Sequence, residues 1–291
     1  MSADRRRYVV AYDGERETLQ WARSFARSLD VALDVVVVVR TDDPFAGPYP
    51  PVGDVTGVIA EQARGWAQDA LALLRDGDDD GPGVEARADV RTAASVPEGL
   101  LEAAAETGAA AVVVGAASGL GVGPVARTLL HASPVPVVLV PRREPRAGVE
   151  ALYVAVGTRP GATAVLEEAW EAAVRTGLPL HVVSLVEHDV EHDGDRARVD
   201  PDAVTRVQAL VEEIRAKAAP AQVSVEVGRG RTMAEAVSSI DWAAGGLLIV
   251  GSARLARGRQ TFLGPTAARI LRHVPVPVVV VPRHSQQRDA R

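Results

Sequence analysis

The chain of 291 residues contains no cysteine, and Lys217 is the only lysine among its 32 basic residues. The absence of cysteine excludes disulfide bonds, thiolate catalysis and cysteine-ligated metal sites. Aromatic residues make up only 4% of the chain, so its core must be built from Val, Leu and Ala. We interpret the near absence of lysine as coding bias rather than as a functional signal.

Long apolar runs are missing as well, since none approaches the roughly 18 residues that a membrane span requires. The start of the chain, MSADRRRYVV, passes directly into a strand-like segment, which is not typical of a signal peptide. We therefore expect a cytoplasmic protein with no membrane partner. The net charge of −6 argues against nucleic acid as a partner.

One segment of about twenty residues occurs twice. Residues 123–142 read GPVARTLLHASPVPVVLVPR and residues 264–283 read GPTAARILRHVPVPVVVVPR, with 12 of 20 positions identical at a spacing of 141 residues. This spacing exceeds the roughly 20–50 residues of a solenoid repeat and is about the size of a whole domain. The sequence therefore predicts two copies of one domain, residues 1–143 and 149–284, followed by a polar tail, residues 285–291. The junction, residues 142–148, is short and polar.

Each half alternates strand-like and helix-like segments. Apolar runs predict strands, and apolar residues at helical spacing predict helices. In the first half we expect strands at 7–12, 31–39, 84–90, 110–114 and 135–140, and helices at 15–29, 58–74, 97–107 and 124–132. In the second half we expect strands at 153–156, 180–186, 223–227, 247–250 and 276–281, and helices at 163–176, 201–218, 233–243 and 265–272.

This alternation predicts the α/β class, with two doubly wound parallel sheets and helices on both faces. In such sheets a ligand lies beyond the carboxyl ends of the strands, where the strand order reverses. The relevant segments are the turn after the first strand and the glycine-rich loop after the fourth strand of each half.

Three features carry a resemblance to the universal stress protein family, in its tandem form. They are the opening VVAYDG, the Val-Val-Gly exit from the fourth strand, and the repeated Gly-helix-Pro-x-Pro-Val ending. The resemblance covers essentially the whole chain. It implies two Rossmann-like domains of the adenine nucleotide alpha-hydrolase type, each with five parallel strands in the order 3-2-1-4-5. It also implies ATP as a candidate ligand, with an aspartate after strand one on the adenine and a G-x2-G-x9-G-(S/T) loop around the phosphates.

The first half departs from that pattern in its loop. Asp13, followed by Gly14, stands where the adenine aspartate is implied, but Gly115 and Gly123 are only 8 apart, where the pattern requires 13. Gly119 and Gly121 keep the shortened loop flexible without restoring its reach. We weigh two roles for Asp13, fixing the turn before the helix and contacting a ligand, and favour the structural role.

The second half departs in the opposite way. Gly251 and Gly264 have the required spacing of 13, but Arg254 replaces the second glycine, and Gly157 or Thr158 stands where an aspartate is implied. Both halves place a proline at the final Ser/Thr position, which removes one N–H and one hydroxyl from an anion site. Thr266 partly compensates in the second half. Arg254 is either a solvated loop residue or an anion ligand.

Two further motifs are interpreted as loops. Residues 76–81, DGDDDG, open like a calcium loop, but Arg87 stands where a bidentate Glu is required. Residues 188–192 match H-x-x-E-H, but they follow a strand and precede Asp-Gly, whereas the motif needs a helix. No metal site and no catalytic residue is assigned.

The last strand of each half forms a sheet edge in the implied order, and β-branched edges favour pairing. We expect the two fifth strands to pair within the chain, which leaves a further homodimer open. The predicted function is non-enzymatic: a stress-response or regulatory protein that acts mainly through an unidentified protein partner, with degenerate nucleotide sites. The alternative is a sensor of ATP, AMP or a small anion.

Overall fold

The computed structural model of the protein describes residues 5–41, 55–75, 84–117, 122–157, 162–187, 222–252 and 263–282, together with residues 205, 207–209, 211 and 212. In the first half the strands are β1 (Arg7–Ala11), β2 (Ala32–Arg40), β3 (Ala86–Ala93), β4 (Ala111–Gly115) and β5 (Val137–Val140). The helices there are α1 (Arg16–Leu29), α2 (Val55–Arg75), α3 (Val96–Thr107) and α4 (Pro124–Ala132). The tail predicted at 285–291 lies outside these residues, and the predicted domain boundaries stay a prediction.

The second half repeats this order. Its strands are β6 (Ala151–Ala155), β7 (Leu180–Glu187), β8 (Val223–Gly230), β9 (Gly246–Gly251) and β10 (Val278–Val281). Its helices are α5 (Ala162–Thr176), α7 (Met233–Ser238) and α8 (Pro265–Leu271). The described residues between 205 and 212 are helical and belong to the helix predicted at 201–218.

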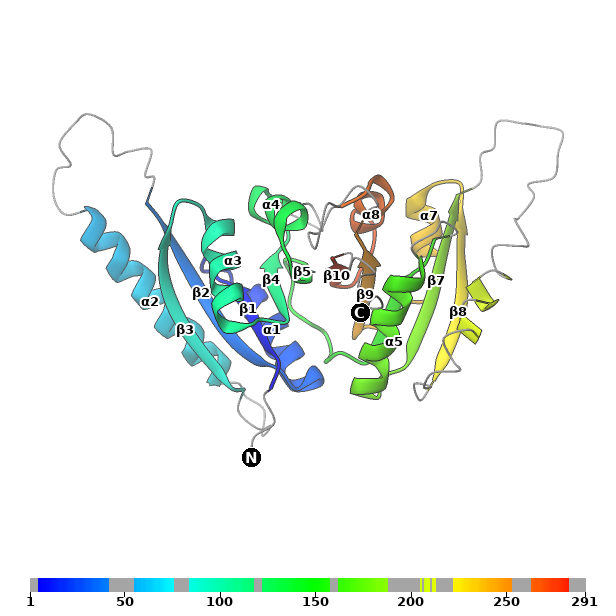
Figure 1. The fold of residues 1–291 in the computed structure, drawn as a ribbon, viewed down its shortest axis with the longest axis horizontal. Coiled ribbons are helices and arrows are strands. Elements are labelled where there is room, and N and C mark those ends of the chain that lie inside the picture. The colour runs from blue at the N-terminus through cyan, green and yellow to red at the C-terminus, as the bar shows by residue number, and fades with distance from the viewer. Residues whose placement is uncertain are drawn as a thin grey trace, which may run out of the picture.

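The ten strands of the described residues form one sheet in the order β3-β2-β1-β4-β5-β10-β9-β6-β7-β8. Each half therefore has the order 3-2-1-4-5, with parallel neighbours throughout. Figure 1 shows the two halves side by side, with β5 and β10 between them. The predicted α/β class is confirmed. The halves meet where β5 and β10 pair in antiparallel fashion, with Val138 opposite Val279.

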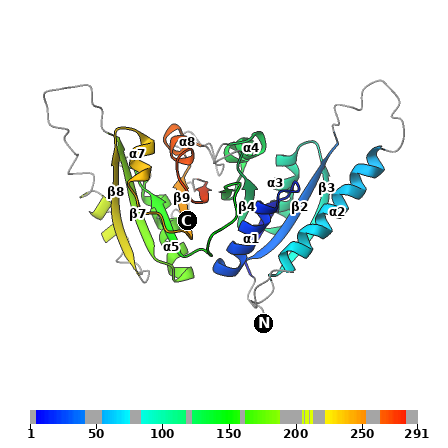
Figure 2. The same ribbon diagram turned by 180° about the vertical axis from the view of Figure 1, so that it is seen from behind.

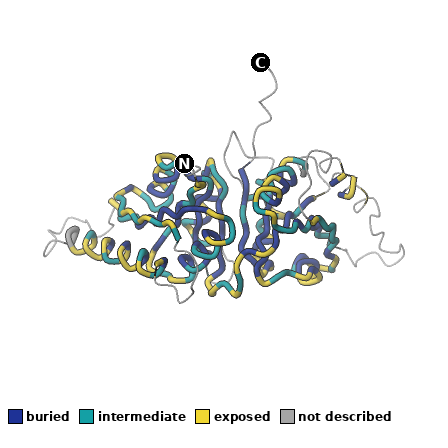
Figure 3. The backbone as a smooth tube through the Cα atoms, turned by 90° about the horizontal axis from the view of Figure 1, so that it is seen from below, coloured by how far each residue is buried: buried dark blue, intermediate teal, exposed yellow. Residues whose placement is uncertain are grey.

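Two apolar layers cover the sheet, and each layer runs through both halves. One lies under α1, α2 and α5 and includes Leu19, Phe25 and Trp170. The other lies under α3, α4, α7 and α8 and includes Leu100, Leu129 and Leu271. The view from behind in Figure 2 shows the same division, and Figure 3 shows buried residues along the strands and exposed residues on the outer sides of the helices.

Capping explains where the third helix of each half begins. Ser95 accepts a hydrogen bond from the Glu98 backbone N–H at 3.4 Å, and Thr232 accepts one from the Glu235 N–H at 3.2 Å. Glu235 in turn accepts from the Arg231 N–H at 2.8 Å, which satisfies a further free donor at the helix start. Helical spacing alone placed these starts to within one residue.

Three predicted elements were too long. The helix predicted at 233–243 ends at Ser238, because the backbone beyond it is engaged elsewhere. The Tyr153 hydroxyl donates to the Asp241 carbonyl and accepts from the Ala243 N–H, and the Trp242 indole donates to the Val237 carbonyl. The strands predicted at 135–140 and 276–281 begin two residues later, since prolines 136 and 277 have no N–H to donate to a ladder.

The connection between the halves packs along α1. The Trp21 indole donates to the Arg143 carbonyl at 2.7 Å, and Ser28 accepts from the Val149 N–H at 2.9 Å. At Gly148 a Cβ would lie 2.8 Å from the Ser28 hydroxyl, so a larger residue would displace this side chain from its hydrogen bond. The junction predicted as a polar linker is therefore held by hydrogen bonds from the first half.

Candidate functional site

The turn after β1 is ordered by its own aspartate. Asp13 is exposed, and one of its carboxylate oxygens accepts a hydrogen bond from the Glu15 backbone N–H at 3.3 Å. Gly14 has φ of +99°, a conformation that side-chain-bearing residues rarely adopt. The structural role predicted for Asp13 is thus present, and its exposure leaves the carboxylate accessible from solvent.

At the exit of β4, Gly115 lies against α1. A Cβ at this position would lie 2.8 Å from the Thr18 hydroxyl, so glycine allows the close approach of helix and strand. Gly123 is the N-cap of α4, followed by Pro124 at the first helical position, and has no side chain with which to cap the helix. Gly119 lies outside the described residues.

Arg142 is a candidate that the sequence reasoning missed. Its Nε donates to the Ala116 carbonyl at 3.1 Å, and a terminal nitrogen lies 4.0 Å from the Glu15 carboxylate. The guanidinium therefore bridges the exit of β4 and the turn that carries Asp13, and it is about half exposed. One signal could have found it, since both copies of the repeat end in Pro-Arg.

A groove of about 640 Å³ opens beside the same turn, between α1 and α2. Tyr12, Gly14 and Trp66 contribute to its walls. Charged groups of both signs also line it, with Arg16 and Asp69 among them. The volume is within the range of roughly 300–1,000 Å³ that is usual for small-molecule sites.

The second half has the same backbone with different side chains. The N–H groups of Tyr12 and Val156 make equivalent bonds to β2 and β7, which places Gly157 at the position of Asp13. Gly251 closes β9 as Gly115 closes β4, and a Cβ there would lie 3.2 Å from Val165.

The loop after β9 leads to α8. Gly264 is the buried N-cap of α8, and Thr266 is exposed in its first turn. Arg254 and Thr158 lie outside the described residues. Asp13 follows β1 of the first half, and the longer loop follows β9 of the second half. Because β5 and β10 pair in antiparallel fashion, the strands of the two halves run in opposite directions, and the two features do not form one site.

Other site classes find no support in the described part of the chain. No group of three or more His, Asp or Glu side chains there could hold a metal ion. The acidic turn at 76–81 and the H-x-x-E-H segment at 188–192 both lie outside the described residues. No described helix combines the length and the apolar character that crossing a membrane requires.

Comparison with known proteins gives one consistent result. The model of the universal stress protein family matches twice, at residues 5–141 and 149–282. Universal stress proteins of Mycobacterium tuberculosis and Mycobacterium bovis are each 28% identical over 282 residues, which span 91% of this chain and 94% of theirs. Both halves of the chain therefore have counterparts in these relatives.

Solved structures agree on the fold. A universal stress protein from Archaeoglobus fulgidus superposes with a TM-score of 0.67 at 18% identity, over 97% of this chain and all of that one. A structure described as a putative universal stress protein from Pseudomonas aeruginosa gives a TM-score of 0.54 at 16% identity, over 95% of this chain and 92% of that one.

Proposed function

Because the chain belongs to the universal stress protein family, in its tandem form, we propose that it is a non-enzymatic stress-response protein that acts mainly through protein interaction. It is proposed to work in the cytoplasm, with an unidentified protein partner and with nucleotide sites that have degenerated in both halves. ATP is then not a resident cofactor.

The observation that carries this proposal is the complementary loss in the two halves. The half with Asp13 has a loop five residues shorter than the nucleotide pattern, and the half with the full spacing has Gly157 in place of the aspartate. The scaffold itself is kept in both halves, including the strand register and the β5–β10 pairing. The features that have been kept are therefore those of a binding scaffold rather than of a nucleotide pocket.

Calorimetric titration of ATP, ADP and AMP tests the proposal. We expect no heat of binding at millimolar nucleotide for the wild type, and none for Asp13→Ala. Binding by the wild type that Asp13→Ala abolishes would overturn the proposal. Asp89→Ala is the matched control, because Asp89 is also an exposed acid but lies on β3, away from the turn.

A second candidate function is a sensor of adenine nucleotide or a small anion, acting in the first half. It is supported by the groove beside Gly14 and by the Arg142 guanidinium, which supplies a positive charge near Asp13. A bound phosphate would accept hydrogen bonds from the Arg142 guanidinium and from free backbone N–H groups.

Arg142→Gln separates the two functions. If the protein is a nucleotide sensor, this variant and Asp13→Ala should both weaken nucleotide binding about tenfold or more, since each removes a charged partner. Gly157→Asp gives a complementary test, because it restores the aspartate in the half whose loop has the full length. Gain of ATP binding in Gly157→Asp over a silent wild type would support degeneration at this position.

A further inference from the structure

A small cavity lies at the junction of the two halves, on the side of the sheet that α1 and α5 cover. Its volume is about 90 Å³. Apolar residues from both halves line it, including Val138 of β5, Val279 of β10 and Leu152 of β6. The cavity is separate from the Asp13 turn, because its residues lie near the amino ends of β1, β4 and β6.

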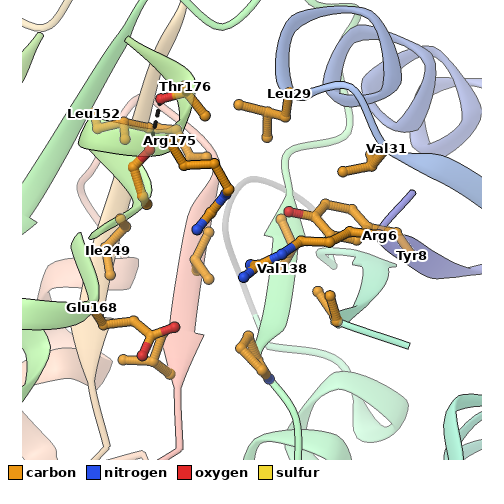
Figure 4. A pocket seen from close by; sticks show the side chains of 17 residues that line it. Arg6, Tyr8, Leu29, Val31, Val138, Leu152, Glu168, Arg175, Thr176 and Ile249 are labelled. Carbon is orange, nitrogen blue, oxygen red and sulfur yellow. Dashed lines mark hydrogen bonds between the residues drawn. The ribbon is translucent and has the colours of Figure 1, made fainter. Parts of the chain in front are cut away.

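Two guanidinium groups face this cavity, one from each half. Arg6 directly precedes β1, and Arg175 lies in the last turn of α5. Figure 4 shows the two side chains pointing toward one another across the space, with the Tyr8 hydroxyl directed toward the same region. A site with this composition offers several hydrogen-bond donors to an anion.

Arg6 differs from the arginines on either side of it. Arg5 pairs with Asp30 at 3.1 Å, and Arg7 pairs with the buried Asp34 at 2.7 Å. Among the described residues, the guanidinium groups of Arg6 and Arg175 have no ion pair within 4.0 Å and no hydrogen bond. Glu168 also lines the cavity, without an ion pair to either arginine.

The two positive charges oppose each other. Partial burial lowers the pKa of Arg175, and the charge of Arg6 lowers it further, which together outweigh the opposing effect of Glu168 and Glu171. Burial raises the pKa of Tyr8, so its phenol keeps the proton and remains a donor. Both arginines are exposed, so an anion can reach them from solvent. An anion between them would replace repulsion by two charge-assisted contacts.

We propose that this cavity binds one phosphate-type oxyanion, held between Arg6 and Arg175 with Tyr8 as a further donor. A cavity of about 90 Å³ suits a small tetrahedral oxyanion rather than a nucleoside. Guanidinium groups match such oxyanions in bidentate geometry. Because each half supplies one arginine, the anion binds only to the assembled pair of halves and stabilises their contact.

Titration with inorganic phosphate tests the site, with sulfate as a second tetrahedral oxyanion and chloride at equal ionic strength as the background. We expect saturable phosphate binding to the wild type that Arg6→Gln and Arg175→Gln each weaken about tenfold or more, because each loses a charge-assisted contact. Arg272→Gln is the matched control, since it removes one exposed positive charge at the C-cap of α8, and Arg272 does not line the cavity. Arg175→Lys keeps the positive charge but loses the bidentate geometry of the guanidinium, and it should bind phosphate with intermediate strength.

Thermal unfolding distinguishes a ligand site from a structural role. Without phosphate, Arg6→Gln and Arg175→Gln should unfold at the same temperature as the wild type or higher, since each removes repulsion. With phosphate, only the wild type and Arg272→Gln should gain stability. A lower unfolding temperature of both glutamine variants without phosphate would overturn the proposal, because it would assign the arginines a structural role.

The source of the phosphate group is resolved by a further titration with glycerol phosphate. Binding of glycerol phosphate that exceeds that of inorganic phosphate and depends on both arginines would support a phosphomonoester as ligand, and the reverse order would support free phosphate. Absence of binding by both, or binding unchanged in Arg6→Gln and Arg175→Gln, would overturn the site. This result is independent of nucleotide binding at Asp13, which Asp13→Ala reports separately.

Discussion

Near the amino ends of their strands, the two halves carry different side chains at equivalent positions. In the first half, Val9 on β1 and Arg87 on β3 flank Asp34 on β2. In the second half, Tyr153 on β6 and Ser224 on β8 flank His181 on β7 in the same register. One position therefore carries a buried carboxylate in one half and an imidazole in the other.

The first half stabilises this position with charge. Asp34 is buried, and it accepts hydrogen bonds from Arg7 at 2.7 Å and from Arg87 at 2.6 Å. Glu85 gives Arg7 a second carboxylate at 3.0 Å. Burial acts to raise the pKa of Asp34, but the hydrogen bonds from Arg7 and Arg87 outweigh it, so the pKa lies below its ordinary value.

The second half stabilises the same position with aromatic packing. Tyr153 stacks on His181 with ring centroids 4.7 Å apart. Trp242 packs against Tyr153 at the same centroid distance. The imidazole Nδ1 lies 2.7 Å from the Ser224 hydroxyl. The comparison teaches that the strand register is held by the backbone and the apolar layers, and that quite different side-chain groups can fill the position.

The largest expected effect is the loss of the buried carboxylate. Asp34→Ala should lower the free energy of unfolding by about 3 kcal/mol, because it leaves two arginines beside a partly buried gap. Urea unfolding followed by circular dichroism measures this, and hydrogen exchange shows whether the loss is confined to the first half. Asp89→Ala, at an exposed ion pair, should change stability by less than about 1 kcal/mol. Equal effects of both substitutions would contradict the assigned role of Asp34.

The carboxylate also makes the first half sensitive to acid. The folded-state pKa of Asp34 lies below the ordinary 3.8, so its ionised form contributes stability above that value. This contribution is lost as the pH falls through the lower, folded-state pKa. The stability difference between the wild type and Asp34→Asn should therefore be constant near neutral pH and shrink below about pH 4. A difference that stays constant into that acid range would show that ionisation of Asp34 contributes nothing.

A smaller effect is expected in the aromatic group of the second half. Tyr153→Phe removes a hydroxyl that donates to the Asp241 carbonyl at 3.0 Å and accepts from the Ala243 N–H at 2.9 Å. The free energy of unfolding should fall by about 1–2 kcal/mol, because two part-buried hydrogen bonds are lost. Denaturant titration measures the change, which should show no dependence on acid like that of Asp34. If Tyr153→Phe left the free energy of unfolding unchanged, water would be replacing the hydroxyl at this position.

The smallest effects concern the two glycines that close the fourth strands. Gly115→Ala should cost about 1 kcal/mol or more, because its Cβ would lie 2.8 Å from the Thr18 hydroxyl. Gly251→Ala should cost less, since its Cβ would lie 3.2 Å from Val165, which needs to move only slightly. Thermal unfolding of the matched pair checks the order, and a larger loss for Gly251→Ala would contradict it.

Much of the fold could be predicted from local patterns. The valine run of β2 and the amphipathic stretch of α1 were placed to within one residue. A strand buried on both faces leaves a continuous apolar run, and a helix buried on one face leaves apolar residues at helical spacing. The end of α7 was wrong, since it is decided by hydrogen bonds between the backbone near Asp241 and Tyr153, 88 residues away in the chain. Local spacing carries no information on such a contact.

The candidate site could be predicted only in part. Asp13 and the glycines were found because a turn and a close approach restrict residue type. Arg142 was missed, because its role depends on the Ala116 carbonyl of another strand. Arg6 and Arg175 gave no sequence signal, since nothing in two isolated arginines indicates that they face one cavity.

The sequence by itself determined the duplication, the α/β class and the complementary losses in the two loops, because these depend on repeats, periodicity and residue spacing. Only the tertiary structure decided which charges meet. The antiparallel pairing of β5 and β10 brings Arg6 of one half opposite Arg175 of the other, and the strand register places Asp34 between Arg7 and Arg87. Electrostatic interactions depend on distance in space, and that distance is set by how the halves and strands assemble.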